Sequence, residues 1–416
     1  MKVFNISKKF IIYLFAICLN PLICLFPRNK KKWVYGSFLS FRDNPKYLFY
    51  WTQECHPEIR SIWIAHQKSD VYLLREKGFE VYFWKSLKGL FHALTAKVYI
   101  FDHHVGNINI FLFGGAFLFN LWHGSSVKRV RWQALKYFVQ KYNLTSEKDV
   151  RTSLWVRIME YPILFLKSDL CLAPSTIQAK EFFAPMMDIP LENCIVGVYP
   201  RSRLMIEGKV AAESFIRKYE PQETIDFVNR LKRYKKTYIY MPTWRNDGTD
   251  FIKNAGFQWE QLNEVMKEKE DLFILKLHPF TRLDVSMLSK YSNICFYPAA
   301  SDIYTVLPFI DCLITDYSSI YTDFLTMDKE IILFVFDYDE YVRNSYDLYE
   351  YDKYFIGSRA NNFEELLRLI KTDKDCHVPK EKRDYLIDFY WENNARDIDL
   401  VEEVKKRLRG LKENID

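Results

Sequence analysis

The sequence has no Cys-x-x-Cys pair, no His/Cys grouping at zinc spacing, and no glycine-rich loop of the Walker or dinucleotide-binding type. Its eight cysteines are scattered, and three of them (Cys171, Cys194 and Cys312) lie in apolar stretches, where Cys behaves as a small hydrophobe. These absences argue against a disulfide framework, a structural zinc site and a P-loop. The cysteine pattern is typical of a reducing compartment.

Glycine and proline are scarce, with 13 and 15 residues in 416, which excludes a fibrous or disordered chain. The formal charge of +6 is modest for this length, so we expect no nucleic-acid partner. Basic residues cluster at 28–32, 128–141 and 230–236, where they suit anionic lipid, phosphorylated substrates or simply solubility. Apolar residues make up 49% of the chain, enough for two or three domains.

Residues 10–27 form an uncharged apolar run of about the minimum length that crosses a bilayer. Basic residues flank the run on both sides, and Asn20 and Pro21 are expected to break a straight helix. We therefore expect residues 1–29 to lie in or dip into the inner leaflet, with the basic flanks on anionic headgroups. A single-span anchor and an amphipathic helix packed on the globular body are the alternatives.

From residue 30 onward, short apolar segments alternate with longer helical ones, the pattern of βα units around a parallel sheet. The pattern pauses at a polar stretch and then restarts, so the sequence predicts two doubly wound α/β domains facing a cleft. The predicted parts are a membrane-associated segment (1–29), a first domain (30–205), a linker helix (206–236), a second domain (237–375) and a charged helical tail (376–416). Ligands of such sheets bind at the carboxyl ends of strands, so motifs directly after strands matter most.

The first motif is Leu121–Lys128, with the sequence LWHGSSVK. His123 ends a predicted strand, Gly124 allows close approach of the backbone, and Lys128 is expected on the helix that follows. Because the pKa of an imidazole lies near working pH, His123 can act as a base on an acceptor hydroxyl. The alternative is a structural histidine that caps this helix.

The second motif is Pro242-Thr243-Trp244-Arg245, directly after another predicted strand. It combines a hydroxyl, an aromatic face and a guanidinium suited to phosphate oxygens. Taken alone, it is also compatible with an ordinary strand-to-loop corner.

The third motif places His278 at a strand end in the second domain, fixed by the following Pro279. It mirrors His123 in the first domain. If the two domains close over a cleft, we expect both imidazoles to face one reacting phosphate. One would remove a proton, and the other, protonated, would offset charge on the phosphoryl oxygens.

The fourth motif is Asp316-Tyr317-Ser318-Ser319, where an apolar strand meets a helix that also contains Asp323. The two serine hydroxyls and the free N–H groups of the first helical turn are expected to make an anion site. Helix capping is the alternative, and both can hold at once.

Other polar groups near strand ends carry weaker expectations. His103 and His104 follow the predicted strand that ends at residue 102, so we expect them near the cleft. Asp337-Tyr338-Asp339 resembles a metal-binding pair but has no further ligand nearby in the sequence. We interpret it as loop polarity and expect no metal or other cofactor.

The four motifs together resemble the CDP-glycerol glycerophosphotransferase family, which includes teichoic acid primases and polymerases. Trp33–Ser37 with Asp43–Lys46 is similar to the family's opening strand and helix, and 328–333 with 337–343 is also similar. Gly197–Arg201 resembles its Gly-x-Pro-Arg turn, although Tyr199 shifts the spacing. The resemblance covers roughly residues 30–400.

The resemblance implies a GT-B-like fold, a membrane-peripheral enzyme on the cytoplasmic face, and no catalytic metal. It implies that His123 and His278 carry catalysis and that the second domain holds CDP-glycerol, the donor. Glycerol phosphate would pass to a hydroxyl of a lipid-linked glycan or polyol phosphate acceptor, with CMP released. The residues expected to contact substrate are Pro242, Thr243, Trp244, Arg245, Asp316, Ser318, Ser319 and Asp323, with Gly124 and Lys128 on the acceptor side.

The chain departs from the family pattern after His123-Gly124, where Ser125-Ser126-Val127-Lys128 replaces the usual Thr-Pro-Leu-Lys. This departure affects the expected identity of the acceptor more than that of the donor. The alternatives are a GT-B glycosyltransferase that uses a nucleotide sugar for capsule or lipopolysaccharide, a CDP-ribitol-dependent transferase, and a catalytically silent anion-binding module.

Overall fold

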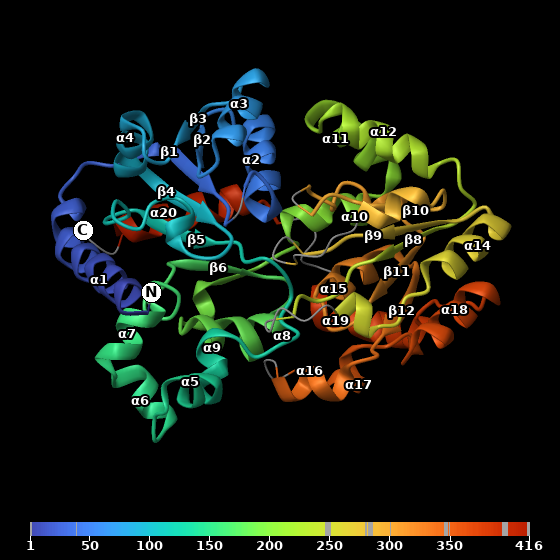
Figure 1. The fold of residues 1–416 in the computed structure, drawn as a ribbon. Coiled ribbons are helices and arrows are strands. Elements are labelled where there is room, and N and C mark those ends of the chain that lie inside the picture. The colour runs from blue at the N-terminus through green and yellow to red at the C-terminus, as the bar shows by residue number, and fades with distance from the viewer. Residues whose placement is uncertain are drawn as a thin grey trace. The chain divides into compact units, whose positions relative to one another are not determined.

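The computed structural model describes residues 2–38, 40–245, 251–278, 281, 286–299, 301–344, 348, 350–392 and 398–413. They form two compact units, each built on one sheet (Figure 1). The first unit contains residues 1–123, 130–201 and 391–416, and the second contains 124–129 and 202–390. The chain thus enters the second unit for six residues directly after His123, and returns to the first unit at its C-terminal end.

The first unit has a seven-stranded sheet in the order β3-β2-β1-β4-β5-β6-β7, and all its strand pairs are parallel. The order reverses between β1 and β4, as in a doubly wound fold. Trp33, Val34 and Tyr35 of β1 are fully buried, as expected for a strand covered on both faces. The strands are β1 (Asn29–Gly36), β2 (Arg60–Ala65), β3 (Val81–Phe83), β4 (Ala96–Phe101), β5 (Phe117–Asn120), β6 (Leu170–Ala173) and β7 (Cys194–Val196).

The second unit has a six-stranded parallel sheet in the order β10-β9-β8-β11-β12-β13, which reverses between β8 and β11. One face is covered by α14 (Trp259–Lys269) and α18 (Phe363–Lys371), whose apolar side chains join the strands in one core. The strands are β8 (Thr237–Tyr240), β9 (Leu272–Leu275), β10 (Ile294–Phe296), β11 (Cys312–Thr315), β12 (Glu330–Phe334) and β13 (Ser358–Ala360).

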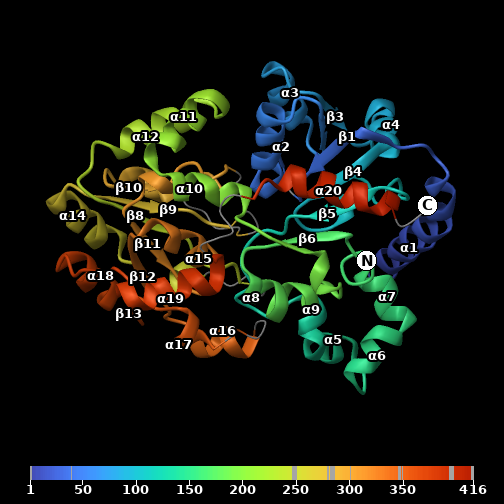
Figure 2. The ribbon, with the colours of Figure 1, turned by 180° about the vertical axis from the view of Figure 1, so that it is seen from behind.

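Helices connect the strands in both units, as the view from behind also shows (Figure 2). The first unit has α2 (Asp43–Cys55), α3 (Lys68–Glu76), α4 (Leu87–Thr95), α5 (Leu135–Tyr142), α6 (Glu147–Thr152), α7 (Leu154–Glu160), α8 (Thr176–Gln178), α9 (Ala184–Met187) and α20 (Leu400–Glu413). The second has α10 (Arg203–Glu207), α11 (Lys209–Tyr219), α12 (Gln222–Leu231), α13 (Phe251–Asn254), α15 (Ile320–Phe324), α16 (Tyr338–Asn344), α17 (Tyr351–Tyr354) and α19 (Lys380–Trp391).

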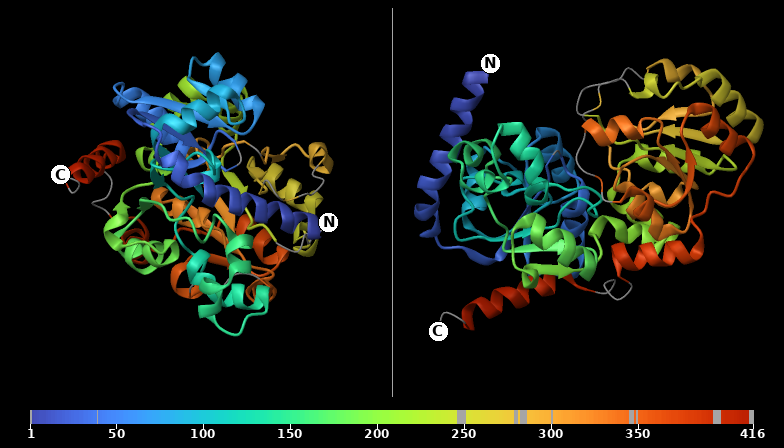
Figure 3. Two further views of the ribbon diagram at one scale, coloured as in Figure 1. Left: turned by 90° about the vertical axis from the view of Figure 1, so that its left-hand side faces the viewer. Right: turned by 90° about the horizontal axis from the view of Figure 1, so that it is seen from below.

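The N-terminal helix α1 (Lys2–Cys24) lies along the first unit beside α7 (Figure 3). Lys9 Nζ donates to the carbonyl of Met159 at 3.0 Å, and the rings of Tyr13 and Tyr161 meet edge to face. Ala16 and Ile23 are buried, while Ile11 and Leu14 are exposed. The helix therefore packs on the globular body, which was one of the alternatives expected from the sequence.

Two details of the N-terminal expectation are wrong. The helix does not break at Pro21 but continues to Cys24. Arg28 is not a free headgroup ligand, because its guanidinium donates to four backbone carbonyls, those of Ala93, Ala96, Leu112 and Gly114. Within the described residues, no helix combines the length and the apolarity needed to cross a membrane.

The expected single linker helix over 206–236 is also wrong. This range contains the end of α10 and then two separate helices, α11 and α12. Gly208, with φ 87°, lies between α10 and α11. A positive φ of this kind is easily adopted only by glycine, so Gly208 ends α10 and lets α11 start in a new direction.

Candidate active site

The first sheet holds a buried carboxyl group at the point where its strand order reverses. Asp102 follows β4, and its side chain accepts hydrogen bonds from Ser37 Oγ and, at 3.1 Å, from the backbone N–H of Phe38, both of which follow β1. Asp102 is 3% exposed. Burial, together with the nearby carboxylate of Asp43, raises the pKa of Asp102 to about 8, so it is largely protonated at neutral pH.

His123 lies close to this carboxyl group. Its Nδ1 is 3.2 Å from the backbone carbonyl of Asp102, and its ring is exposed. A neutral imidazole that donates from Nδ1 keeps its lone pair on Nε2. His123 can therefore accept a proton from a hydroxyl placed beside that atom.

Two asparagines fix the backbone that carries His123. The N–H of Trp122 donates to Asn120 Oδ1 at 2.9 Å, and the carbonyl of Trp122 accepts from Asn44 Nδ2 at 2.8 Å. Trp122 has φ 54°, a left-handed conformation that a bulky residue adopts only when its surroundings impose it. Because residues 123–130 are not helical, His123 does not cap a helix, and that alternative is wrong.

Lys128 is not on a helix, contrary to expectation. It forms an isolated β-bridge with Leu348, and its Nζ donates to Tyr341 Oη at 2.6 Å within the second unit. The helical segment begins only at Arg131. Loss of solvation lowers the pKa of Lys128 to about 8, with Asp316 acting in the opposite direction. Gly124, at the start of this segment, has φ 147°, which favours glycine.

The second sheet repeats the arrangement at its own reversal point. Asp316 follows β11, and its Oδ1 accepts from the N–H and the Oγ1 of Thr243, which follows β8, at 2.8 and 2.7 Å. Asp316 is fully buried, and Tyr351 Oη donates to its backbone carbonyl at 2.9 Å. The second and fourth motifs are thus brought together, as their positions at neighbouring strand ends predict.

Arg245 lies between two carboxylates and is 7% exposed. Its guanidinium donates to Asp316 Oδ2 at 2.9 Å and to both oxygens of Asp337, at 2.8 and 3.0 Å. Although burial opposes its charge, the two carboxylates raise the pKa of Arg245. With one positive charge facing two negative ones, this guanidinium holds the strand-end loops together before any ligand arrives.

The interpretation of Asp337 as loop polarity is wrong, and the sequence analysis missed its role in the site. Its side chain is largely buried, and besides pairing with Arg245 it accepts from Tyr317 Oη at 3.0 Å. Tyr317 stacks on Tyr341 with ring centroids 4.1 Å apart. The available signal was its place directly after the apolar strand at 330–334, the same position that singled out the other motifs.

Trp244 and His278 face each other at adjacent strand ends, since β8 and β9 are neighbours in the sheet. Their ring centroids are 6.1 Å apart and their planes are nearly parallel. Both side chains are exposed, whereas Pro242 is buried. This pair offers a nucleotide an aromatic surface and an imidazole at one place.

Ser318 and Ser319 precede α15, which has only five residues, so its dipole is weak. Both serines are half-buried, and Ser318 Oγ is 3.5 Å from the N–H of Ile320. Asp323 is fully buried and accepts from Ser202 Oγ at 2.9 Å and Tyr304 Oη at 3.1 Å. Asp323 therefore supports this loop from inside, and the two serines are the members that can reach a ligand.

Among the described residues, His56, Glu58 and Glu402 are close enough together to hold a metal ion. Lys405 already occupies this place, with Nζ donating to Glu402 at 2.7 Å and to Glu58. Because the ammonium group of Lys405 is bonded to both carboxylates, it would compete directly with a metal ion. We therefore interpret the cluster as an ion-pair network.

Comparison with known proteins places this geometry in a family. Residues 19–395 match the model of the CDP-glycerol:poly(glycerophosphate) glycerophosphotransferases. The chain is 28% identical over 206 residues to a teichoic acid poly(ribitol-phosphate) polymerase of Bacillus spizizenii, covering 48% of this chain and 32% of that one. It is 23% identical over 363 residues to a teichoic acid poly(glycerol phosphate) polymerase of Bacillus subtilis, covering 83% of this chain and 44% of that one.

The chain therefore spans less than half the length of these two relatives. Among solved structures, that of the wall teichoic acid polymerase TagF superposes with a TM-score of 0.69 at 19% identity, covering 99% of both chains. This likeness confirms the predicted α/β fold with parallel sheets.

The raised pKa of Asp102 predicts a pH-dependent stability. Because the folded state keeps the proton up to about pH 8 while an unfolded Asp releases it near pH 4, the free energy of unfolding falls as pH rises through this interval. The slope from this one group is at most about 1.4 kcal/mol per pH unit. Urea unfolding at pH 5 and pH 8 should show a smaller loss of stability for Asp102→Asn than for the wild type, and equal slopes would contradict the assignment.

Removing Arg245 should destabilise the second unit strongly. Arg245→Met leaves Asp316 and Asp337 buried without their cation, a change that typically costs about 3–5 kcal/mol. Urea unfolding monitored by circular dichroism measures the effect, with Trp244→Leu, at the neighbouring exposed position, as the control. A loss no larger for Arg245→Met than for the control would show that the cation is not needed.

Proposed function

Because this chain belongs to the CDP-glycerol:poly(glycerophosphate) glycerophosphotransferase family, we propose that it transfers glycerol phosphate from CDP-glycerol to a hydroxyl of a teichoic-acid or capsule-type acceptor. The match over residues 19–395 includes all four motifs. The observation that supports the proposal most directly is the edge of the second sheet, where three neighbouring strands, β9, β8 and β11, end in the polar motifs that contain His278, Thr243-Trp244 and Ser318-Ser319.

We place the donor at this edge of the second unit. Thr243, Ser318 and Ser319 supply hydroxyl donors for the diphosphate, and Trp244 supplies a surface for the nucleoside. The remaining motif residues do not contact the donor in this proposal, because each of them is buried: Pro242, Arg245, Asp316 and Asp323. Their role is to hold the contact residues in position, which is how phosphoryl transfer is chiefly accelerated.

The transfer then needs one base and one stabilising cation. The acceptor oxygen attacks the β-phosphorus of CDP-glycerol, the bond from that phosphorus to the bridging oxygen breaks, and CMP leaves with the bond's electron pair. Nε2 of His123 takes the acceptor proton, while His278 in its protonated form offsets the charge on the phosphoryl oxygens. Gly124 and Lys128, which follow His123, are placed on the acceptor side. No metal or other cofactor enters this scheme.

A CDP-ribitol donor is the second candidate. It is favoured by the similarity to a poly(ribitol-phosphate) polymerase. Ribitol and glycerol differ only in chain length beyond the phosphate, so the diphosphate contacts suit both. Selection between CDP-glycerol and CDP-ribitol must therefore come from residues that face the polyol.

We also propose that α1 docks the enzyme on an anionic membrane at its cytoplasmic face, where a lipid-linked acceptor is available. Ile11 and Leu22 on this helix are 64% and 58% exposed, and Leu154 and Trp155 on the adjoining α7 are exposed as well. Several large apolar side chains exposed together on two adjoining helices are typical of a surface that binds at a membrane interface. All eight cysteines are free, which fits a reducing compartment.

A donor screen tests the transfer. With CDP-glycerol, CDP-ribitol, UDP- and GDP-sugars offered in parallel, CMP should be released from a CDP-polyol, and mass spectrometry should find one polyol phosphate added to the acceptor. His123→Asn and His278→Ala should each lower kcat by at least about a hundredfold. Release of UDP or GDP from a sugar donor would favour a glycosyltransferase, and unchanged turnover in both variants would place the chemistry elsewhere.

Vesicle co-sedimentation tests the membrane contact. The double variant Ile11→Ser, Leu14→Ser should bind phosphatidylcholine–phosphatidylglycerol vesicles at least about tenfold more weakly, because each side chain contributes about 1.5 kcal/mol or more when buried in the interface. Leu87→Ser with Val210→Ser, at exposed apolar positions away from α1, is the matched control. Equal binding by both double variants would contradict docking through α1.

A further inference from the structure

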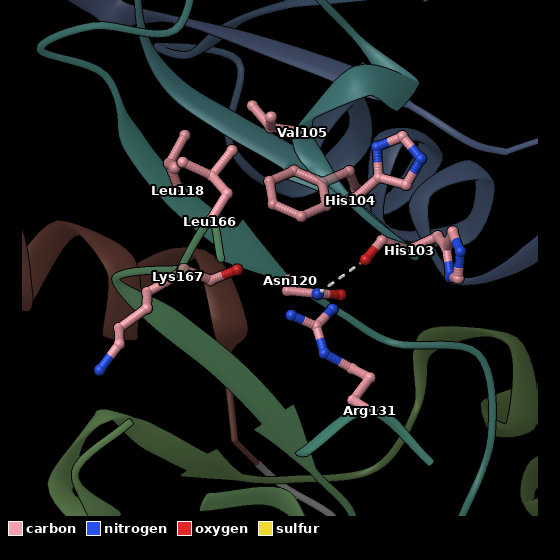
Figure 4. A pocket seen from close by; sticks show the side chains of 10 residues that line it. His103, His104, Val105, Leu118, Asn120, Arg131, Leu166 and Lys167 are labelled. Carbon is pink, nitrogen blue, oxygen red and sulfur yellow. Dashed lines mark hydrogen bonds between the residues drawn. The ribbon is translucent and has the colours of Figure 1, made fainter. Parts of the chain in front are cut away.

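A small hollow in the first unit lies close to His123, whose ring centroid is 5.6 Å from that of His103 in its wall. It is formed at the ends of β4 and β5 and by the segment that leads into β6, with His103, His104, Asn120, Arg131 and Lys167 in its wall (Figure 4). It has about 190 Å³ of empty space, part of which is open to solvent. The hollow as a whole has room for about one water-sized group.

Arg131 gives this hollow an unmatched positive charge. The residue is 8% exposed, and neither a hydrogen bond nor an ion pair reaches its guanidinium from the described part of the chain. Its one close partner is the ring of Trp122, whose centroid is 5.9 Å from Cζ, near the outer limit for a cation–π contact. Nε of this planar group with five N–H donors is buried without a hydrogen-bond partner.

The surroundings do not supply the missing negative charge. No carboxylate lines the hollow. Lys167, in its wall, is itself a cation, and the carboxylate that pairs with it, Asp188 at 2.9 Å, does not line the hollow. The nearby carboxyl of Asp102 bonds to Ser37 and Phe38, and its pKa is raised to about 8, so it is mostly uncharged at neutral pH.

The backbone also holds Arg131 in place at a conformational cost. Its φ is 51°, in the left-handed region that few non-glycine residues adopt. Strain of this kind persists where the surroundings impose a particular side-chain direction. Asn120 Nδ2 donates to the carbonyl of His103 at 3.2 Å and its Oδ1 accepts from Trp122, so the wall opposite the guanidinium is firmly built (Figure 4).

We propose that this hollow binds the oxygens of a phosphate group, with Arg131 as the principal ligand and His103 and His104 beside it. Planar guanidinium donors match phosphate oxygens in geometry and charge. Because the hollow has room for about one water-sized group, one or two phosphate oxygens reach Arg131 and the rest of the ligand lies outside the hollow. If the chain transfers glycerol phosphate as proposed above, this phosphate is a phosphodiester of the acceptor, bound near the base His123.

His104 fits this role in its neutral form. Its Nδ1 accepts the N–H of Gly106 at 3.0 Å, so the neutral ring carries its proton on Nε2 and can donate from there. Burial and the charge of Arg131 lower the pKa values of His103 and His104. An anion in the hollow would oppose that effect and raise both.

Phosphate binding to the full chain, measured by calorimetry against chloride at equal ionic strength, tests the site without turnover. Wild type should bind inorganic phosphate, Arg131→Gln should bind it at least about tenfold more weakly, and Arg131→Lys should fall between them. Lys136→Gln removes the same charge from an exposed position nearby and should bind like wild type. The measurements are made with CMP present, so that phosphate sites for the donor are filled.

A second readout uses wild type alone, in case Arg131→Gln folds poorly. The ring resonances of His103 and His104, assigned with His→Gln variants, should shift on addition of phosphate, and their pKa values should rise. An absence of these shifts, or equal phosphate affinity in wild type and Arg131→Gln, overturns the site.

The source of the phosphate is decided by comparing ligands. Glycerophosphoglycerol, a phosphodiester, should bind at least as tightly as inorganic phosphate, and glycerol should not compete. Binding of inorganic phosphate alone would overturn the acceptor assignment. If the site binds the phosphodiester but no CDP-polyol is consumed, the proposed transfer fails while the phosphate site stands.

Discussion

Both sheets depend on one interaction, a buried aspartate that joins the two strands between which the strand order reverses. In the first unit Asp102, after β4, accepts from Ser37 and from the backbone after β1. In the second unit Asp316, after β11, accepts the hydroxyl and the backbone N–H of Thr243, after β8. The loops of a doubly wound sheet diverge at this point, so a carboxyl group that ties them together fixes the polar edge on which any ligand must bind.

The two units differ in how they balance this carboxyl group. Asp316 has a cation, Arg245, which is shared with Asp337 and packs over Tyr341. Asp102 has no such partner among the described residues, and burial raises its pKa. The second edge is thus held by a buried ion-pair network in which one guanidinium joins two carboxylates. In the first unit Arg131 has no ion-pair partner among the described residues, and the phosphate site proposed above rests on this difference.

Much of the fold and part of the site follow from local sequence patterns. The strands are buried on both faces, so continuous apolar runs such as Trp33–Tyr35 and Cys312–Thr315 can be predicted as strands from the sequence. The polar residues directly after these runs mark the edges of the sheets. The position of Lys128 and the unpaired state of Arg131 could not be found this way. Each depends on which distant segment supplies a partner, and that is decided by tertiary packing rather than by neighbours in sequence.

The proposed function requires that the donor's diphosphate binds at the edge of the second sheet. Its most direct test is a crystal structure of His123→Asn with CDP-glycerol bound. The account predicts phosphate oxygens within hydrogen-bond distance of Thr243 or Ser318, with His278 beside them and the Arg245–Asp316 pair intact. A diphosphate bound elsewhere, or one that displaces Asp316 from Arg245, would contradict it.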